Sequence, residues 1–315
     1  GRHTALSTTN KAMLHAYIVV VVVAVAYAVL TAEAATPNSF GTIRTLWATS
    51  GEDNFQGSVA MGPIYGSGRP DFTLVRTGGT YVCRNEGSLL VSWACPRVYS
   101  SSGGNFGAVA SGRFVNQSAL VADLAVSTSM PNAGVLKNVY ANGTFDYAQF
   151  SASLNAKWLA SGVFTTGTEV DLVAATATEV LVFVNEGGGS FPLQRIVYTS
   201  TAIRTPCLVA RISDDTLDDV VFAGVTGSGH DGIWTAVANG DGTFTTVMIA
   251  EAQDSSLITT AFAAGNFGGF GPGADLVFST TGTNALYVLN RTAPGVWGTP
   301  TKIFTAASNP ASLTT

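Results

Sequence analysis

The sequence predicts an all-β protein, a β-propeller of five to six, or seven, four-stranded blades with a hydrophobic segment at its N-terminus. Three observations predict this fold. Strands that begin with aspartate recur five times, at intervals of 52, 48, 48 and 56 residues. Each copy contains four short apolar runs separated by turn residues, which is the pattern of one propeller blade of about fifty residues. The chain also has 35 glycines but only 11% charged residues, as expected of a turn-rich sheet protein.

The repeating unit is clearest around Asp171. The apolar run WLASGVF precedes this residue, a buried strand begins at it, and residues 180–184 form the next strand after a turn. A turn from Asn185 to Phe191 leads into a last strand, LQRIVYTS. The corresponding aspartates are Asp71, Asp123, Asp171, Asp219 and Asp275, and the asparagines predicted to end the following strands are Asn85, Asn142, Asn185, Asn239 and Asn290.

Residues 1–35 are predicted to be a separate hydrophobic arm, and residues 36–315 the propeller. Three interpretations of the arm remain open. Small residues at Ala32 and Ala34 after an apolar stretch are typical of a secretory signal peptide. Alternatively, residues 12–32 form a helix that anchors the chain in a membrane or packs at the core of a filament. Five consecutive valines instead favour strands inserted into a blade.

The ends of the repeat are incomplete. The segment TPNSFGTIRTLW, which begins at Thr36, resembles the end of the unit at Asn185, with Asn38 and Phe40 at the turn. We therefore expect the N-terminal region to supply at least the outer strand of another blade. That blade is completed by residues 17–30, or by a neighbouring subunit, or the ring has five blades with extra strands.

The strand and turn motifs also resemble a known repeat family. The DLxV strands, the turns NGTF at Asn142 and NGDGTF at Asn239, and the tripeptides GRF, GVF and GNF are similar to FG-GAP or VCBS-type repeats over residues 39–305. This resemblance implies an adhesive or scaffold role, as in integrin-like and bacterial cell-surface propellers. It also implies a calcium-binding loop before the DLxV strand, but the loops FVNQSALVAD, FTTGTEVD and FGGFGPGAD offer only one or two carboxylates.

Metal binding is not predicted. Calcium takes six to eight oxygen ligands, and only SDDTLDD, with the weak candidates Asp214, Asp215 and Asp219, approaches this number. The five repeated aspartates are predicted to be turn residues whose carboxylates accept backbone N–H bonds.

Cysteines and glycosylation sequons indicate a secreted protein. Cys83 and Cys95 are either a disulfide across a hairpin or two free thiols, because the strand register cannot be read from sequence. Cys207 is predicted to be a small core residue. Sequons at Asn116, Asn142 and Asn290 fall in loops on one side of the ring, so we expect N-linked glycans there and a bare opposite side.

Catalysis and nucleic-acid binding find little support. His230 is the only propeller histidine, and no triad or phosphate-loop spacing accompanies it. A net charge of −5 without a basic cluster excludes a nucleic-acid partner. We expect a non-enzymatic, extracellular structural or adhesive protein, a homopolymer of glycosylated subunits assembled through the N-terminal arm. The alternative is a monomeric, secreted or membrane-anchored propeller that binds surface carbohydrates or proteins.

Overall fold

The protein is described by a computed structural model over residues 59–66, 70–76, 79–85, 95–100, 106–115, 121–128, 132–138, 144–151, 153–204, 207–251, 259–267, 273–280, 285–293 and 295–305. The predicted arm, residues 1–35, lies outside these ranges, as do the sequons at Asn116 and Asn142. Within the described ranges, no helix is long and apolar enough to cross a membrane.

Five four-stranded antiparallel sheets follow one another along the chain, and we number them sheets 1 to 5. Sheet 1 contains β1 (Val59–Gly62), β2 (Asp71–Arg76), β3 (Gly79–Cys83) and β4 (Arg97–Tyr99). Sheet 2 contains β5 (Phe106–Gly112), β6 (Asp123–Thr128), β7 (Ala133–Lys137) and β8 (Asp146–Ser151). Sheet 3 contains β9 (Trp158–Gly162), β10 (Asp171–Ala175), β11 (Glu179–Val184) and β12 (Leu193–Thr199).

Sheet 4 contains β13 (Leu208–Ala210), β14 (Asp219–Val225), β15 (Asp231–Ala238) and β16 (Phe244–Glu251). Sheet 5 contains β17 (Thr259–Gly265), β18 (Asp275–Thr280), β19 (Ala285–Leu289) and β22 (Thr301–Thr305). A two-stranded sheet of β20 (Arg291–Ala293) and β21 (Val296–Trp297) lies between β19 and β22 in the chain.

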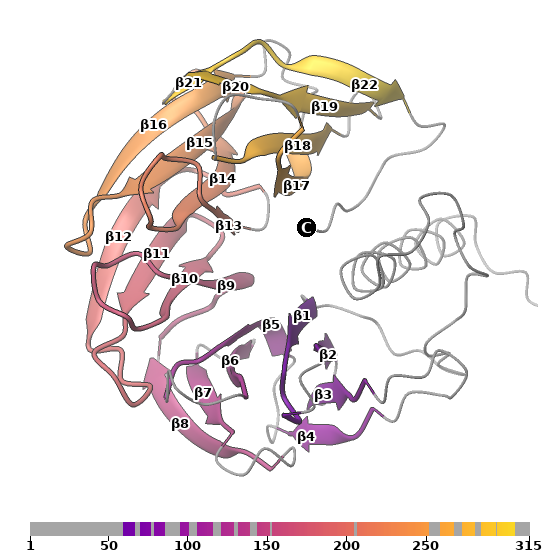
Figure 1. The fold of residues 1–315 in the computed structure, drawn as a ribbon, viewed down its shortest axis with the longest axis vertical. Coiled ribbons are helices and arrows are strands. Elements are labelled where there is room, and N and C mark those ends of the chain that lie inside the picture. Colours follow the sequence, from indigo (N-terminus) through magenta and orange to yellow (C-terminus); the bar gives the residue numbers. More distant parts are fainter. Residues whose placement is uncertain are drawn as a thin grey trace, which may run out of the picture.

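The sheets are arranged like propeller blades. Each pairs its strands in chain order, and the five sheets follow an arc (Figure 1). The first strand of each sheet lies toward the centre of the arc and the fourth, which we call the outer strand, lies at its periphery (Figure 1). The predicted all-β class and the four-stranded antiparallel unit are therefore confirmed.

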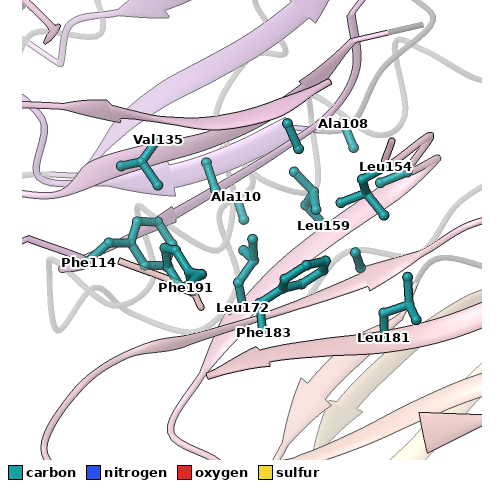
Figure 2. Packing of buried hydrophobic residues seen from close by; sticks show 14 residues of the cluster. Ala108, Ala110, Phe114, Val135, Leu154, Leu159, Leu172, Leu181, Phe183 and Phe191 are labelled. Carbon is teal, nitrogen blue, oxygen red and sulfur yellow. The ribbon is translucent and has the colours of Figure 1, made fainter. Parts of the chain in front are cut away.

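The sheets pack face to face through apolar side chains. Between sheets 2 and 3, Phe183 and Phe191 meet Phe114 and Val135 in a buried cluster (Figure 2). Similar clusters lie between sheets 1 and 2, 3 and 4, and 4 and 5. Strands β10 and β18 are buried along their whole length, because both of their faces are covered. This explains why the Asp-initiated strands read as continuous apolar runs rather than alternating ones.

A register shift recurs between the third and outer strand of all five sheets. It places one extra residue in each outer strand, as in a β-bulge. These extra residues, which we call the bulge residues, are Val98, Phe150, Val197, Ile249 and Ile303. The first four pack against the buried cluster that their own sheet shares with the next one.

The structure corrects one predicted strand end, at Asn142, and the position that meets the aspartate in two other sheets. Strand β7 ends at Lys137, so Asn138, and not Asn142, follows it. In sheet 4, the backbone N–H that binds the aspartate belongs to Ala238, the last residue of β15. In sheet 5, it belongs to Arg291, which follows Asn290. The sequence has an asparagine near each of these turns, but the loops differ in length. Only the hydrogen-bond pattern therefore identifies the equivalent positions.

Candidate functional site

The five repeated aspartates have one arrangement in common. Each begins the second strand of its sheet and is buried. One carboxylate oxygen accepts a backbone N–H bond of 2.8–3.0 Å from the end of the third strand, donated by Asn85, Asn138, Asn185, Ala238 or Arg291. The other accepts bonds of 2.7–3.0 Å from the loop before the aspartate, donated by Ile64, Tyr65, Val115, Phe164, Ile212, Ser213 or Phe267. These carboxylates hold backbone turns together, and their oxygens are taken up by that task.

Burial affects the titration of three of these groups. Desolvation raises the pKa of Asp123, Asp171 and Asp219 above the ordinary value of 3.8, and the backbone N–H bonds partly oppose this rise. These three carboxyl groups are shielded from water within turns, and they are not solvated groups open to a ligand.

The weak metal candidates have protein partners. Asp214 Oδ1 lies 2.8 Å from the Arg291 guanidinium, and Asp215 Oδ1 accepts bonds from Ser213 Oγ and the Leu217 N–H. Asp219 is one of the five turn aspartates. Within the described ranges, no three His, Cys, Asp or Glu side chains are grouped as a metal site requires. The structure therefore does not bring the three candidates together around one point.

The structure places all three cysteines and the sequon at Asn290. A disulfide joins Cys83, at the end of β3, to Cys95, just before β4. Cys207 is buried, and desolvation raises the pKa of its thiol to about 12. Asn290 is exposed beside the short β20–β21 hairpin, while Arg291, the middle residue of its sequon, is buried.

The turn between β14 and β15 holds a cluster of polar side chains that the sequence singled out only through His230. The turn closes through bonds from the Thr226 N–H and Oγ1 to the His230 carbonyl, at 2.7 and 3.0 Å. Glu251, at the end of β16, accepts bonds from Thr226 Oγ1 at 3.1 Å and Ser228 Oγ at 2.9 Å. We call Thr226, Ser228, His230, Trp234 and Glu251 the turn cluster.

Two glycines lie in the strands beside the turn cluster. Gly224 and Gly232 are directly paired, and Gly232 is paired on its other side with Glu251. A Cβ at Gly232 would lie 2.9 Å from Thr226 Cγ2, 3.0 Å from Trp234 Nε1 and 3.2 Å from Met248 Sδ. The missing side chain thus lets the indole N–H lie close to the turn.

An aromatic pair borders the cluster from the neighbouring sheet. Tyr198 of β12 lies 4.8 Å from Trp234, measured between ring centroids, at an angle of 40°. Burial raises the pKa of Tyr198, and a side-chain hydrogen bond with Ser200 opposes this. Both rings are half-buried, so apolar ring surface lies next to the polar turn cluster where sheets 3 and 4 pack together.

Three buried polar atoms at this turn have no hydrogen-bond partner among the described residues. They are His230 Nδ1, Asp231 Oδ2 and Trp234 Nε1. Asp231 is 7% exposed, and its other oxygen lies 3.3 Å from Arg204 Nε. Successive strand residues point to opposite faces, so Asp231 faces the side of sheet 5 while Trp234 faces sheet 3. Because unpaired buried polar atoms are rare and costly, this turn is the best candidate for a ligand site.

Comparisons with known proteins do not assign a family. No protein-family model matches the chain, and no curated protein matches it, so the resemblance to FG-GAP or VCBS repeats remains a prediction. Among solved structures, the chain is similar to a lectin from Agrocybe aegerita described as recognising non-reducing terminal N-acetylglucosamine, with 15% identity over 81% of each chain and a TM-score of 0.42. It is also similar to the Photorhabdus luminescens Tc holotoxin pore, with 15% identity over 77% of this chain and 12% of that one and a TM-score of 0.40.

Proposed function

We propose that this protein is a non-enzymatic binding module that recognises carbohydrate at the turn cluster of sheet 4. The observation that carries this proposal is the set of unpartnered buried atoms, His230 Nδ1, Trp234 Nε1 and Asp231 Oδ2, at one turn. An indole N–H can only donate and a carboxylate oxygen accepts, whereas a hydroxyl group does both. A hydroxyl-rich ligand therefore suits Trp234 Nε1 on the side of sheet 3, and the same chemistry suits Asp231 Oδ2 on the side of sheet 5.

The aromatic border supports the same ligand class. A sugar ring has an apolar C–H face, and Tyr198 with Trp234 offers half-buried ring surface beside polar groups. Small-molecule sites commonly combine aromatic side chains with a few well-placed polar groups. A neutral, hydroxyl-rich ligand also fits the low charge of the chain, 11% of residues.

Absence of catalysis is part of this proposal. A glycosidase needs two carboxyl groups that flank one bond. At this turn, Asp231 faces sheet 5 while Glu251 is paired with Gly232, which faces sheet 3. The two acids therefore lie on different faces of the same sheet, which suits binding from either side rather than a joint attack on one bond.

The binding test uses the full-length chain on an array of neutral, amino and acidic oligosaccharides, followed by titration calorimetry with the strongest binder. Trp234→Phe retains an aromatic ring but removes the indole N–H donor. Glu251→Gln removes the charge of the carboxylate that accepts hydrogen bonds from Thr226 and Ser228. Each should weaken binding about tenfold, since a lost hydrogen bond to a buried or charged group costs about 1.5 kcal/mol. The matched controls, Trp158→Phe and Glu186→Gln, should bind as the wild type does. Absence of array binding, or equal losses in variants and controls, would contradict the proposal.

A second candidate function is self-association at the extracellular surface, as a homopolymer carrying N-linked glycans. One observation favours it: exposed apolar side chains concentrate on outer strands, with Ile196 on β12, Val247 and Met248 on β16, and Ile303 and Phe304 on β22. Outer strands also lie at the edges of their sheets, and edge strands pair with other chains unless they are protected. Sedimentation of the full chain at increasing concentration separates this function from that of a monomeric binding module, and a constant monomer would rule it out.

A further inference from the structure

The face of sheet 5 that turns away from sheet 4 is built like the faces that contact a neighbouring sheet elsewhere in the arc. In sheets 1 to 4, the bulge residue of the outer strand packs into the cluster shared with the next sheet. The equivalent residue of sheet 5, Ile303, is instead 55% exposed, as is Phe304 beside it. All five residues of β22 are exposed.

Phe304 repeats a second feature of those contacts. Directly after the bulge residue, the outer strand carries Tyr99 in sheet 1, Tyr198 in sheet 3 and Phe304 in sheet 5. Tyr99 stacks on Tyr147 of sheet 2 with 5.0 Å between ring centroids, and Tyr198 lies 4.8 Å from Trp234 of sheet 4. Phe304 has an equivalent position, but sheet 5 has no following sheet among the described residues. The missing neighbour is therefore a sheet with an apolar inner face.

The aromatic residue at the turn before each outer strand identifies what covers a bulge residue. Phe145, Phe191, Phe244 and Trp297 pack into the same clusters as the bulge residue of the preceding sheet. The contact is direct between Phe150 and Phe191, whose ring centroids are 5.2 Å apart. Ile303 and Phe304 thus require one more turn aromatic.

We propose that residues 39–50 of the same chain form the outer strand of a sixth sheet that covers Ile303 and Phe304. Phe40 is the turn aromatic in this segment, and Trp47 follows it by seven residues, as Tyr198 follows Phe191 and Phe304 follows Trp297. Leu46 and Trp47 occupy the positions of Val197 and Tyr198, so they face sheet 1, where Phe72, Leu74 and Cys83 form an apolar cluster.

Chain connectivity fits an intramolecular sixth sheet. Six to eight residues separate each outer strand from the first strand of the next sheet, for example Tyr99 from Phe106 and Thr199 from Leu208. With Trp47 at the position of Tyr198, the proposed outer strand ends at Ala48, and ten residues separate it from Val59, where sheet 1 begins, two more than the longest of those connections. This inference goes beyond the proposed binding function and is independent of it.

Crosslinking tests the placement of Phe40 against Ile303. The full-length double variant Phe40→Cys with Ile303→Cys is treated with a short bis-maleimide, and the products are located by peptide mass spectrometry. We expect an intrachain crosslink. The matched control, Phe40→Cys with Val247→Cys, places its second cysteine on the outer strand of sheet 4 and should remain uncrosslinked within one chain.

Three other outcomes would overturn the proposal: an interchain crosslink, which assigns the segment to a second copy, equal crosslinking in the control, or none. A second measurement avoids dependence on the folding of the double variant. Hydrogen exchange of residues 301–305 in the wild type should be slowed relative to Phe40→Asp by at least tenfold. Equal exchange in the two proteins would also contradict closure by this segment.

Discussion

Asn185 Nδ2 donates a hydrogen bond of 2.8 Å to the carbonyl oxygen of Phe114, which belongs to the preceding sheet. Its own backbone N–H binds Asp171 within sheet 3. Asn138 contacts Ile64, and Arg291 contacts Ile212, in the same way. Between sheets 3 and 4, where Ala238 has no donor side chain, Val163 and Asp218 exchange two bonds of 2.8 and 2.9 Å instead. In sheets 2, 3 and 5, one position therefore fixes both the turn of that sheet and its contact with the preceding sheet.

Asn185→Ala should destabilise the fold through this contact. The substitution removes the donor from the carbonyl oxygens of Phe114 and Val170, and Asn185 is buried. Unsatisfied buried acceptors cost about 1–3 kcal/mol, so we expect the free energy of unfolding in urea to fall by about 2 kcal/mol. Asn155→Ala, at an exposed position, is the control and should change it by less than about 0.5 kcal/mol. Equal values for the two variants would mean that water replaces the side-chain donor.

Arg291→Ala should have a larger effect. The Arg291 side chain is fully buried and its guanidinium contacts Asp214 and the Ile212 carbonyl, each at 2.8 Å. Removing one partner of a buried ion pair costs about 3–5 kcal/mol, and the partial exposure of Asp214 favours the lower end of this range. Arg211→Ala removes an exposed pair with Asp218 at 3.7 Å and should cost less than about 1 kcal/mol. Thermal and urea denaturation of the two variants measure the difference, and the opposite order would refute our account of sheet 4 and sheet 5 contact.

The architecture was predictable because the same physical constraint repeats along the chain. A second strand covered on both faces must be apolar throughout, and its first residue must satisfy the backbone N–H groups at two turns. These requirements produce an aspartate followed by mostly apolar residues at Asp71, Asp123, Asp171, Asp219 and Asp275. The third strands were harder to place, since Asn138 and Asn142 both suit a turn and only hydrogen bonding to Asp123 distinguishes them.

The candidate site was less predictable than the fold. His230 was visible as the only propeller histidine, but pairing between β14, β15 and β16 is what brings Trp234 and Glu251 to the same turn. Their unpaired atoms depend on burial, which the sequence does not show. The paired glycines, Gly224 and Gly232, were the one local signal, because two glycines facing each other in adjacent strands leave room for large side chains.

Cys207 should be inert toward thiol reagents in the native protein. It is buried, and a thiol pKa of about 12 leaves almost no thiolate at pH 8. Iodoacetamide followed by peptide mass spectrometry should label no cysteine in the native chain and Cys207 alone after denaturation without reductant, because Cys83 and Cys95 form a disulfide. Labelling of Cys83 or Cys95 under these conditions would contradict the disulfide, and native labelling of Cys207 would contradict its burial.

Asp123, Asp171 and Asp219 should make stability depend on pH in the direction opposite to that of ordinary carboxylates, because burial raises their pKa. Because the pKa of folded Asp171 is raised above 3.8, the folded chain holds this proton more tightly than the unfolded chain does. The resulting stabilisation is complete below pH 3.8 and is lost as the pH rises through the folded pKa. The difference in unfolding free energy between the wild type and Asp171→Asn should therefore shrink as the pH rises from 4 to 7, in urea titrations at about one-unit steps.

Asp241→Asn is the control for this measurement. Hydrogen bonds from Thr243 lower the pKa of Asp241, so its contribution is present above pH 3.8 and is lost only below it. The difference between wild type and this variant should stay level from pH 4 to 7. If the advantage of wild type over Asp171→Asn instead grew with pH, the N–H bonds from Phe164 and Asn185 would outweigh desolvation, and the turn carboxylates would stabilise the fold as anions.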